Sequence, residues 1–317
     1  MSRFPFPIPS GWFQVEYASD LGPTDVRPLR YFGKDLVLYR TADGAPVLLD
    51  AHCPHLGAHL GKGGTVRGDS IVCPFHAWEF GPTGACTAIP YAKRVPPKAE
   101  VRRWPIVERN GILWAFHDAD GREPTWEIPV VPEADDPEWT GYERHRWTIR
   151  TQPQEIGENA VDRAHFRYVH GTTTIPDSEL SIEGHIRRAA QNVTMATPRG
   201  EVKGRIEIAA HGMGCTITRF TGICETLLVI SHTPIDETHV DSRFSFTQPR
   251  TAQGSRVAAA IVKDIVKQMN EDIPIWEHKD YLETPMLCDG DGPIGAYRRW
   301  SAQFYPSRDL AGGRPSS

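Results

Sequence analysis

The sequence predicts an α+β protein in which a small all-β domain precedes an antiparallel sheet and a long C-terminal helix. Three observations predict this class. Short apolar runs separated by Gly, Asp and Asn fill residues 12–116, as in an all-β domain. Apolar and polar positions alternate over several stretches of residues 180–250, which is typical of strands with one wet face. Residues 255–281 carry apolar side chains at the period of an α-helix.

The domain boundary is expected between residues 118 and 139, which are rich in Pro, Asp, Glu and Gly. We therefore expect two domains, at residues 1–125 and 126–317. After the boundary, residues 154–169 are predicted to be helical, and Gly171 is expected to end the helix. A sheet followed by a long helix suggests a sandwich with room for a ligand between its layers.

Composition restricts the function classes. With 35 basic and 40 acidic side chains, the net charge of −5 argues against nucleic acid as the main partner. No apolar run reaches about eighteen residues, so no membrane span is expected. The proline-rich start, Met1 to Ser10, lacks the apolar core of a signal peptide, and a cytoplasmic location is expected. Six Cys beside thirteen His then favour metal or redox chemistry over disulfides.

Two short motifs combine these residue types. Cys53 and His55 form a Cys-x-His pair, Cys73 and His76 form a Cys-x-x-His pair, and seventeen residues separate the pairs. Two thiolates and two imidazoles suit zinc or iron–sulfur chemistry. Each pair offers one Cys and one His, which fits a [2Fe–2S] centre held by two Cys on one iron and two His on the other. A structural zinc site remains the alternative.

The loop sequences CPHLGA (53–58) and CPFHAW (73–78) closely resemble the cluster-binding loops of Rieske proteins. Pro and Gly around the pairs leave backbone N–H groups free to point at the sulfur atoms. The aromatic residues Phe75, Trp78 and Phe80 would limit the access of solvent to a cluster, which tunes its potential.

A second group of candidate ligands lies in the second domain. His165 and His170 cannot share a face of a regular α-helix, but they converge if the helix bulges or ends between them. A mononuclear oxygenase iron needs two His and one carboxylate. Asp272 is our choice, because it lies on the predicted apolar stripe of the long helix, where an unpaired carboxylate would be costly. That stripe comprises Val257, Ile261, Ile265, Gln268, Asp272 and Ile275 or Trp276. Ordinary packed histidines and a hydrogen-bonded Asp272 remain the alternatives.

The pattern Asn159-x-x-Asp162-x-x-His165-x-x-x-x-His170 resembles the catalytic motif of Rieske oxygenases. The resemblance implies that His165, His170 and Asp272 hold a mononuclear iron(II), and that Asn159 lies beside these ligands. It also implies the helix-grip type of α+β fold for the second domain.

The same resemblance implies a role for Asp162 and a set of partners. In the family, this Asp links the iron site to a Rieske histidine of a neighbouring subunit, which here would be His76. A homotrimer is therefore expected. Electrons would come from an NAD(P)H-dependent reductase, directly or through a ferredoxin, and O2 and a small hydrophobic molecule would be the substrates.

A narrower resemblance covers the C-terminal part of the chain. The segments 272–279, 285–293, 298–300 and 303–305 resemble the C-terminal signature of the 3-ketosteroid 9α-hydroxylase oxygenases and cholesterol 7-desaturases. The implied function is hydroxylation or desaturation of a steroid or sterol by the terminal oxygenase of a monooxygenase system. One alternative is an oxygenase that hydroxylates or demethylates a small aromatic or alkaloid-like substrate. Another is an electron carrier fused to a lipid-binding module, without catalytic iron.

Overall fold

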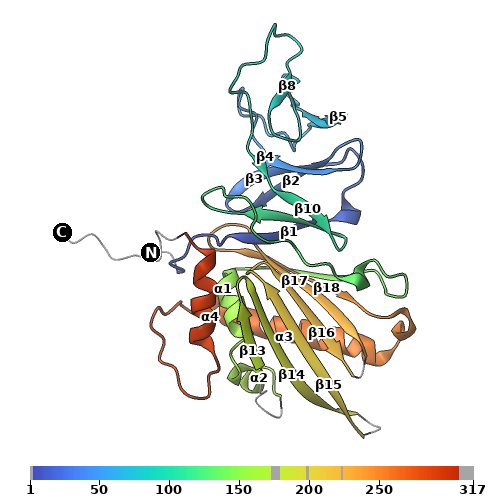
Figure 1. The fold of residues 1–317 in the computed structure, drawn as a ribbon, viewed down its shortest axis with the longest axis vertical. Helices are drawn as coiled ribbons and strands as arrows, with labels where there is room; N and C mark the ends of the chain where they lie inside the picture. The colour runs from blue at the N-terminus through green and yellow to red at the C-terminus, as the bar shows by residue number, and fades with distance from the viewer. Residues whose placement is uncertain (1–2, 173–178, 198–199, 223, 307–317) are drawn as a thin grey trace, which may run out of the picture. The chain divides into compact units, whose positions relative to one another are not determined.

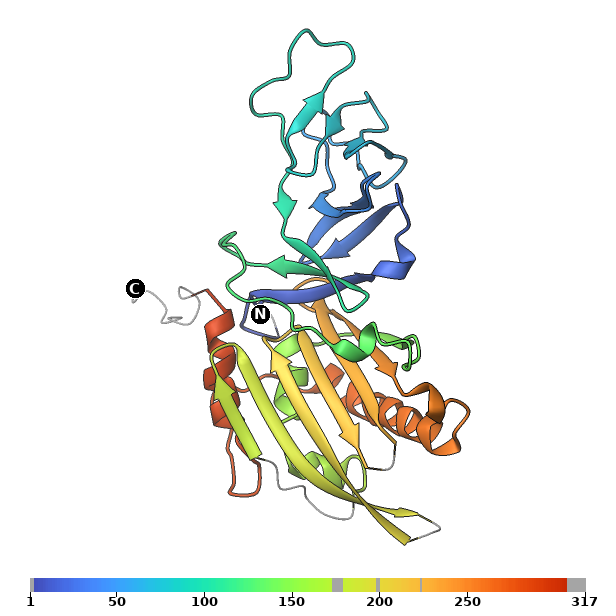
Figure 2. The ribbon, with the colours of Figure 1, turned by 45° about the vertical axis from the view of Figure 1, so that its right-hand side comes forward.

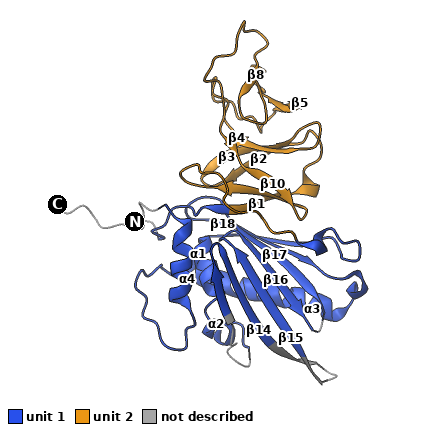
Figure 3. Cartoon of the chain, viewed as in Figure 1, with its two compact units in different colours: residues 1–11, 131–317 blue, residues 12–130 orange. Residues whose placement is uncertain are grey.

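The computed structural model divides the chain into two compact units (Figure 3). One unit comprises residues 12–130, and the other comprises residues 1–11 and 131–317. The residues that the structure describes are 3–172, 179–197, 200–222 and 224–306. The predicted α+β class is confirmed, with antiparallel sheets in both units and the long helix near the C-terminal end.

Short strands build the unit at residues 12–130. Its described strands form three sheets, with the orders β1-β11-β10, β2-β3-β4-β9 and β5-β6-β7-β8. The strands are β1 (Gly11–Tyr17), β2 (Val26–Tyr31), β3 (Lys34–Arg40), β4 (Pro46–Asp50), β5 (Thr65–Arg67), β6 (Ser70–Val72), β7 (Glu79–Phe80), β8 (Cys86–Ala88), β9 (Arg103–Trp104), β10 (Ile106–Arg109) and β11 (Ile112–His117), with a 3-10 turn, η1 (Ala18–Asp20). The apolar run of β11 is buried along its whole length.

Two tight hairpins set the register of these strands. Phe32 and Gly33 connect β2 to β3, and Asn110 and Gly111 connect β10 to β11. All four residues have positive φ, at 55°, 68°, 58° and 70° in that order. Two-residue turns with this backbone match the right-handed twist of the strands they join.

A seven-stranded antiparallel sheet dominates the other unit (Figure 1). Its order is β12-β18-β17-β16-β15-β14-β13, so six consecutive strands form a meander and β12 pairs with the last of them. The strands are β12 (Glu143–Ile149), β13 (Glu179–Glu183), β14 (Ile186–Thr197), β15 (Gly200–His211), β16 (Cys215–Thr221), β17 (Thr226–Pro234) and β18 (Val240–Thr247). The expected wet face is wrong for β18, which is buried on both faces, and β17 is almost entirely buried.

The long helix lies against one face of this sheet (Figures 1 and 2). The helices of the unit are α1 (Pro153–Asn159), α2 (Ala164–Tyr168), α3 (Arg256–His278) and α4 (Ile294–Ser301), with 3-10 turns η2 (Pro132–Ala134), η3 (Arg250–Ala252) and η4 (Ala302–Phe304). Val262, Met269 and Trp276 of α3 pack in one core with Leu228 and Phe244 of the sheet. Burial of this apolar face, more than helix propensity, stabilises α3.

The buried stripe of α3 differs from the predicted one before Asp272, where Met269 is buried in place of the predicted Gln268. Val257 is 44% exposed, and Ala258 and Val262 are buried instead. Adjacent helix positions differ by about 100° around the axis, so both choices satisfy the 3.6-residue period over a short stretch. Asp272 and Trp276 do lie on the buried side, as predicted.

The C-terminal end of α3 is capped by a residue from the beginning of the chain. Arg3 donates Nη1 to the carbonyl of Glu277 (2.8 Å) and Nε to that of Lys279 (2.7 Å), and it also donates to the carbonyl of Trp276. These carbonyls lack partners within the helix, and a cation at this end also interacts favourably with the helix dipole.

Candidate metal centres

Two loops in the unit at residues 12–130 share one backbone arrangement. One follows β4 and begins at Cys53, and the other follows β6 and begins at Cys73. In each loop the amide four residues after the Cys donates to the Cys carbonyl, at 2.9 and 3.0 Å. The Cys amide in turn donates to the carbonyl five residues on, at 2.9 and 2.8 Å. Each loop is therefore a turn closed by two hydrogen bonds of its own backbone.

Both turns need a left-handed residue at the same place. Gly57 has φ +78° in the first loop, and Ala77 has φ +54° in the second. Glycine adopts this backbone freely, whereas an alanine there costs roughly 1–2 kcal/mol. The strain at Ala77 is retained because the two backbone bonds of the turn depend on it.

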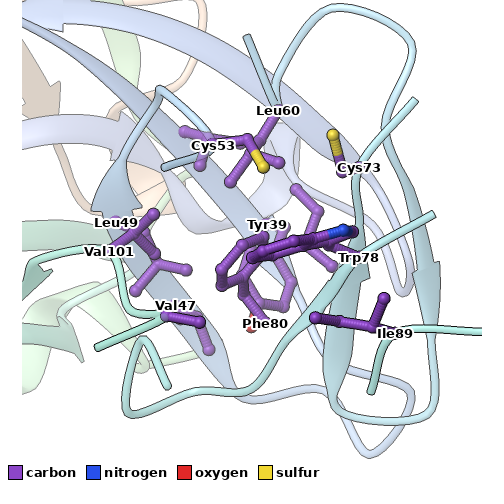
Figure 4. Packing of buried hydrophobic residues seen from close by; sticks show 13 residues of the cluster. Tyr39, Val47, Leu49, Cys53, Leu60, Cys73, Trp78, Phe80, Ile89 and Val101 are labelled. Atoms are coloured by element: carbon purple, nitrogen blue, oxygen red, sulfur yellow. The ribbon is translucent and has the colours of Figure 1, made fainter. Parts of the chain in front are cut away.

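The two thiols of these loops are buried side by side. Cys53 is 2% exposed and Cys73 is 3% exposed. Figure 4 shows both sulfur atoms on one side of the apolar cluster that contains Tyr39, Trp78 and Phe80. Burial, and then the neighbouring Cys73 thiol, raise the pKa of Cys53 to about 11. Two thiolates at this place therefore require a compensating cation.

The two histidines of the loops also meet. The ring centroids of His55 and His76 are 4.7 Å apart, and both side chains are partly exposed. The ring of His55 stacks on Trp78 at 4.7 Å, and Trp78 Nε1 donates to the hydroxyl of Tyr91 at 2.7 Å. The structure thus brings together all four residues predicted for the first site, in a set of two sulfur and two nitrogen donors that fits a [2Fe–2S] centre.

The second predicted site begins at a break in the helix expected over residues 154–169. The structure has α1 and α2 there, separated by residues 160–163, so one continuous helix was wrong. Asp162 Oδ1 accepts from the amides of Ala164 (3.0 Å) and His165 (3.4 Å), which starts the new helix. Helix α2 then ends at Tyr168, between His165 and His170. A helix end at this place was one of the two ways in which the histidines were expected to converge, and a bulge was the other.

The break places three candidate ligands together. One ligand atom each from His165, His170 and Asp272 lies within 4.8 Å of the other two. His165 lies in α2 and His170 lies just after it, whereas Asp272 lies in α3. Two imidazoles and one carboxylate on one side of an ion suit a mononuclear iron with open positions.

The Nδ1 atoms of His165 and His170 each contact a hydrogen-bond acceptor. His165 Nδ1 lies 2.6 Å from the carbonyl oxygen of Asp162. His170 Nδ1 lies 3.1 Å from Glu271 Oε2. Acceptors at Nδ1 place the ring proton there and leave Nε2 of each ring available to bind a metal. Burial also lowers the pKa of His165, which favours the neutral ring that a metal needs.

Asp272 is buried and fixed at the centre of this group. Its carboxylate accepts from Asn159 Nδ2 at 3.0 Å and lies 3.4 Å from His170 Nε2. Burial raises its pKa to about 6, against the smaller opposing influence of His170. A buried carboxylate whose ionised form is disfavoured becomes favourable when a cation is bound beside it. The arrangement therefore fits a divalent metal, and Asn159 orients the ligand as expected of a residue beside it.

Glu271 was missed by the sequence analysis. Besides its contact with His170, it accepts from Lys267 Nζ at 2.6 Å, and this bond holds the pKa of Glu271 below its usual value. Its position one residue before Asp272 and four after Lys267 could have indicated an ion pair on α3. Nothing in the sequence indicates the contact with His170, because that contact depends on the tertiary fold.

The comparisons with known proteins agree with this geometry. Residues 11–105 match the Rieske [2Fe-2S] domain, and residues 115–305 match the 3-ketosteroid 9alpha-hydroxylase C-terminal domain. The chain belongs to the Rieske oxygenases. A relative from Rhodococcus rhodochrous, named as a probable 3-ketosteroid-9-alpha-monooxygenase oxygenase component, is 32% identical over 93% of this chain and 79% of its own length. A cholesterol 7-desaturase from Bombyx mori is 31% identical over 98% of this chain and 72% of its own length.

Solved structures share the fold of this Rieske oxygenase at lower identity. A dicamba monooxygenase bound to 3,6-dichlorosalicylic acid superposes with a TM-score of 0.77 and 19% identity, over 95% of this chain and 97% of the other. The Pseudomonas putida protein NdmA with caffeine has a TM-score of 0.74 and 22% identity, over 92% of this chain and 89% of the other. The Rieske match decides between the zinc and iron–sulfur alternatives in favour of a [2Fe–2S] cluster.

A small cavity of the Rieske oxygenase lies beside Asp162. Its volume is about 20 Å³, and apolar side chains form most of its wall. The lining residues are Ala160, Val161, Asp162, Arg163, Phe166, Ala189, Ala190, Gln191, Ile206 and Ile208. Among the described helices, none has both the length and the apolar character needed to cross a membrane.

Proposed function

We propose that this chain is the terminal oxygenase of a Rieske monooxygenase system that hydroxylates or desaturates a steroid or sterol. Cys53, His55, Cys73 and His76 would hold the [2Fe–2S] cluster in a domain at residues 1–125. The mononuclear iron would lie in the domain at residues 126–317. When bound, the iron supplies O2 activation beside a C–H bond and the cluster supplies the electrons.

The observation that carries the proposal is the meeting of His165, His170 and Asp272 within 4.8 Å, with both Nδ1 atoms already engaged. An electron carrier fused to a lipid-binding module has no use for such a group. Three candidate ligands come together from α2, the residues just after it and α3, and each is oriented by a further residue. This assembly supports a catalytic metal instead.

Each nearby residue has a defined task in this proposal. His165, His170 and Asp272 bind the iron through Nε2, Nε2 and carboxylate oxygen, and Asn159 keeps the Asp272 carboxylate turned toward them. Asp162 occupies the junction of α1 and α2, where one carboxylate oxygen caps α2. The other oxygen is proposed to bond His76 of a second copy in a homotrimer.

The steroid substrate class rests on the relatives at or above 30% identity, which include 3-ketosteroid-9-alpha-monooxygenase oxygenase components and cholesterol 7-desaturases. The apolar wall formed by Ala189, Ile206 and Ile208 suits a hydrocarbon skeleton. Pockets for ligands of this size have volumes of several hundred Å³. A steroid or sterol would therefore need more room than the cavity of about 20 Å³ offers.

The second candidate is oxygenation or demethylation of a small aromatic or alkaloid-like molecule. The fold it shares with the dicamba and caffeine complexes supports this candidate, although at about a fifth identity that likeness concerns the fold.

One experiment separates these candidates. The purified, iron-replete protein is incubated with a surrogate NAD(P)H-dependent reductase and ferredoxin, O2 and a panel of sterols, ketosteroids, aromatic acids and methylxanthines, and products are followed by mass spectrometry. We expect a steroid product that is heavier by one oxygen or lighter by two hydrogens. Turnover of the aromatic or methylxanthine group alone would replace the steroid proposal with the second candidate. The proposed cytoplasmic location is tested by fractionating the source cells.

A further inference from the structure

The imidazole of His170 lies between two consecutive carboxylates of α3. Its Nδ1 is 3.1 Å from Glu271 Oε2, and its Nε2 is 3.4 Å from Asp272 Oδ2. The His170 side chain is 2% exposed, whereas the Glu271 side chain is 31% exposed and reaches the ring from the edge of the site. The two carboxylates are neighbours in sequence but contact opposite nitrogens of one ring.

The two histidines of the site are held by acceptors of different charge. His165 Nδ1 faces a neutral backbone carbonyl, that of Asp162. His170 Nδ1 faces a carboxylate, and a hydrogen bond to an ionised acceptor is roughly twice as strong as one between neutral groups. A carboxylate behind a metal-binding imidazole also raises the basicity of the nitrogen that binds the metal.

The carboxylate of Glu271 is itself fixed in place. Lys267 Nζ donates to Glu271 Oε1 at 2.6 Å, so the two oxygens of Glu271 have separate partners, Lys267 and His170. Lys267 precedes Glu271 by four positions on α3, a spacing at which helix side chains meet. Both residues lie on the helix that carries Asp272, and they therefore move with that ligand.

We propose that Glu271, anchored by Lys267, is a positioning residue of the iron site, which holds the His170 ring with Nδ1 protonated and Nε2 directed toward the metal. The proposal rests on the ligand set in the proposed function and adds a residue to it. Glu271 is not one of the three candidate ligands, and it acts through His170. Its loss should change how tightly the site binds iron(II) and the geometry of the ligands.

The test measures metal binding directly. The mononuclear site is emptied with a chelator, and Fe2+ is titrated back against a competing chelator in the wild type and in Glu271→Ala, Glu271→Gln, Lys267→Ala and Asp264→Asn. Glu271→Ala should weaken Fe2+ binding by about 10- to 100-fold. Glu271→Gln keeps an acceptor oxygen and should recover part of the loss, and Lys267→Ala should show a smaller loss than Glu271→Ala. Asp264→Asn is the matched control, because Asp264 is an exposed carboxylate of α3 whose partner is Gln268.

A spectroscopic measurement separates positioning from a loss of folding. The visible absorption of the Co2+-loaded site should shift in Glu271→Ala, while the far-UV circular dichroism and the absorption of the Rieske cluster stay as in the wild type. Wild-type affinity and an unshifted Co2+ spectrum in Glu271→Ala would overturn the inference. His170→Ala tests the ligand set separately from the role of Glu271. If His170→Ala also binds Fe2+ like the wild type, the proposed ligand set is wrong.

Discussion

The two candidate metal centres are built in opposite ways. The cluster site takes its four donors from two short loops of one small unit, and each loop is closed by hydrogen bonds of its own backbone. The candidate iron site draws on His165 of α2, His170 just after α2 and Asp272 of α3, about a hundred residues further along the sequence. Side chains orient two of these three candidate ligands.

The difference shows where the information for each site lies. A loop closed by its own backbone hydrogen bonds fixes the positions of its Cys and His locally, so the spacing of those residues in the sequence already indicates the site. Ligands that meet across two helices depend on the packing of both, and the residues that aim them can come from any neighbouring element. We therefore expect changes at the first centre to disturb local folding and changes at the second to disturb chemistry.

The largest effect should follow removal of a buried thiol. Cys73→Ser should lose the cluster and its visible absorption, reduce turnover to background, and destabilise the unit at residues 12–130, because metal binding and folding are coupled in such sites. Absorption spectroscopy and thermal unfolding measure both effects. A variant without the cluster that melts like the wild type would show that the loops fold independently of the metal.

Loss of an iron ligand should abolish turnover with little effect on folding. His165→Ala should lower the iron content from about three to about two atoms per chain, since a [2Fe–2S] cluster accounts for two. Metal analysis together with the cluster absorption measures this change. If the cluster is lost along with the third iron, the two centres are not independent, and the comparison above fails.

Asp162→Ala should keep both metals and lose at least about tenfold in turnover, which corresponds to about 1.4 kcal/mol of activation free energy. Because Asp162 also caps α2, the alanine should lower the free energy of unfolding by about 1 kcal/mol. Asp162→Asn separates the two roles of this residue, because asparagine caps a helix as well as aspartate does but carries no charge. This variant should keep the stability of the wild type and lose turnover. If its single-turnover rate equals that of the wild type, Asp162 acts only as a helix cap.

The smallest expected effects compare the two cluster loops with each other. In Gly57→Ala the added Cβ would meet nothing within 4 Å, so the cost is backbone strain alone, about 1 kcal/mol of unfolding free energy. Ala77→Gly should relieve the same strain and stabilise the protein by a few tenths to about 1 kcal/mol. Denaturant unfolding measures both. Changes of the same sign would mean that the loops are not equivalent.

Much of the fold was readable in the sequence because its signals are local. Turns between short strands were predicted over residues 12–116 from Gly, Asp and Asn between apolar runs, and the structure has one such tight hairpin at Asn110 and Gly111. A helix was predicted over residues 255–281 from the period of its apolar side chains, and the structure has α3 there. The start of the buried stripe was misplaced because periodicity defines that a face exists but not which of two adjacent faces is buried. Burial of β18 on both faces depends on contacts made by other segments, which alternation within one strand does not report.

The candidate sites show the same limit. Asp272 could be selected because a lone carboxylate on a buried stripe is costly and so indicates a partner. Glu271 could not be selected, because it is partly exposed and pairs with Lys267, like many acidic residues of helix surfaces. The break at residues 160–163 was also missed. Asp162 starts the new helix α2 there, but an Asp at this position of the sequence is equally compatible with a continuous helix.

The cap on α3 has a practical consequence for how the protein is prepared. Arg3 bonds the end of the helix that carries Asp272, and Phe6 stacks on Tyr305 at 4.9 Å. An affinity tag fused directly before these residues, or a protease that trims them, would act within reach of α3. Iron loading and specific activity should therefore be compared between tagged and cleanly released preparations before any variant is interpreted.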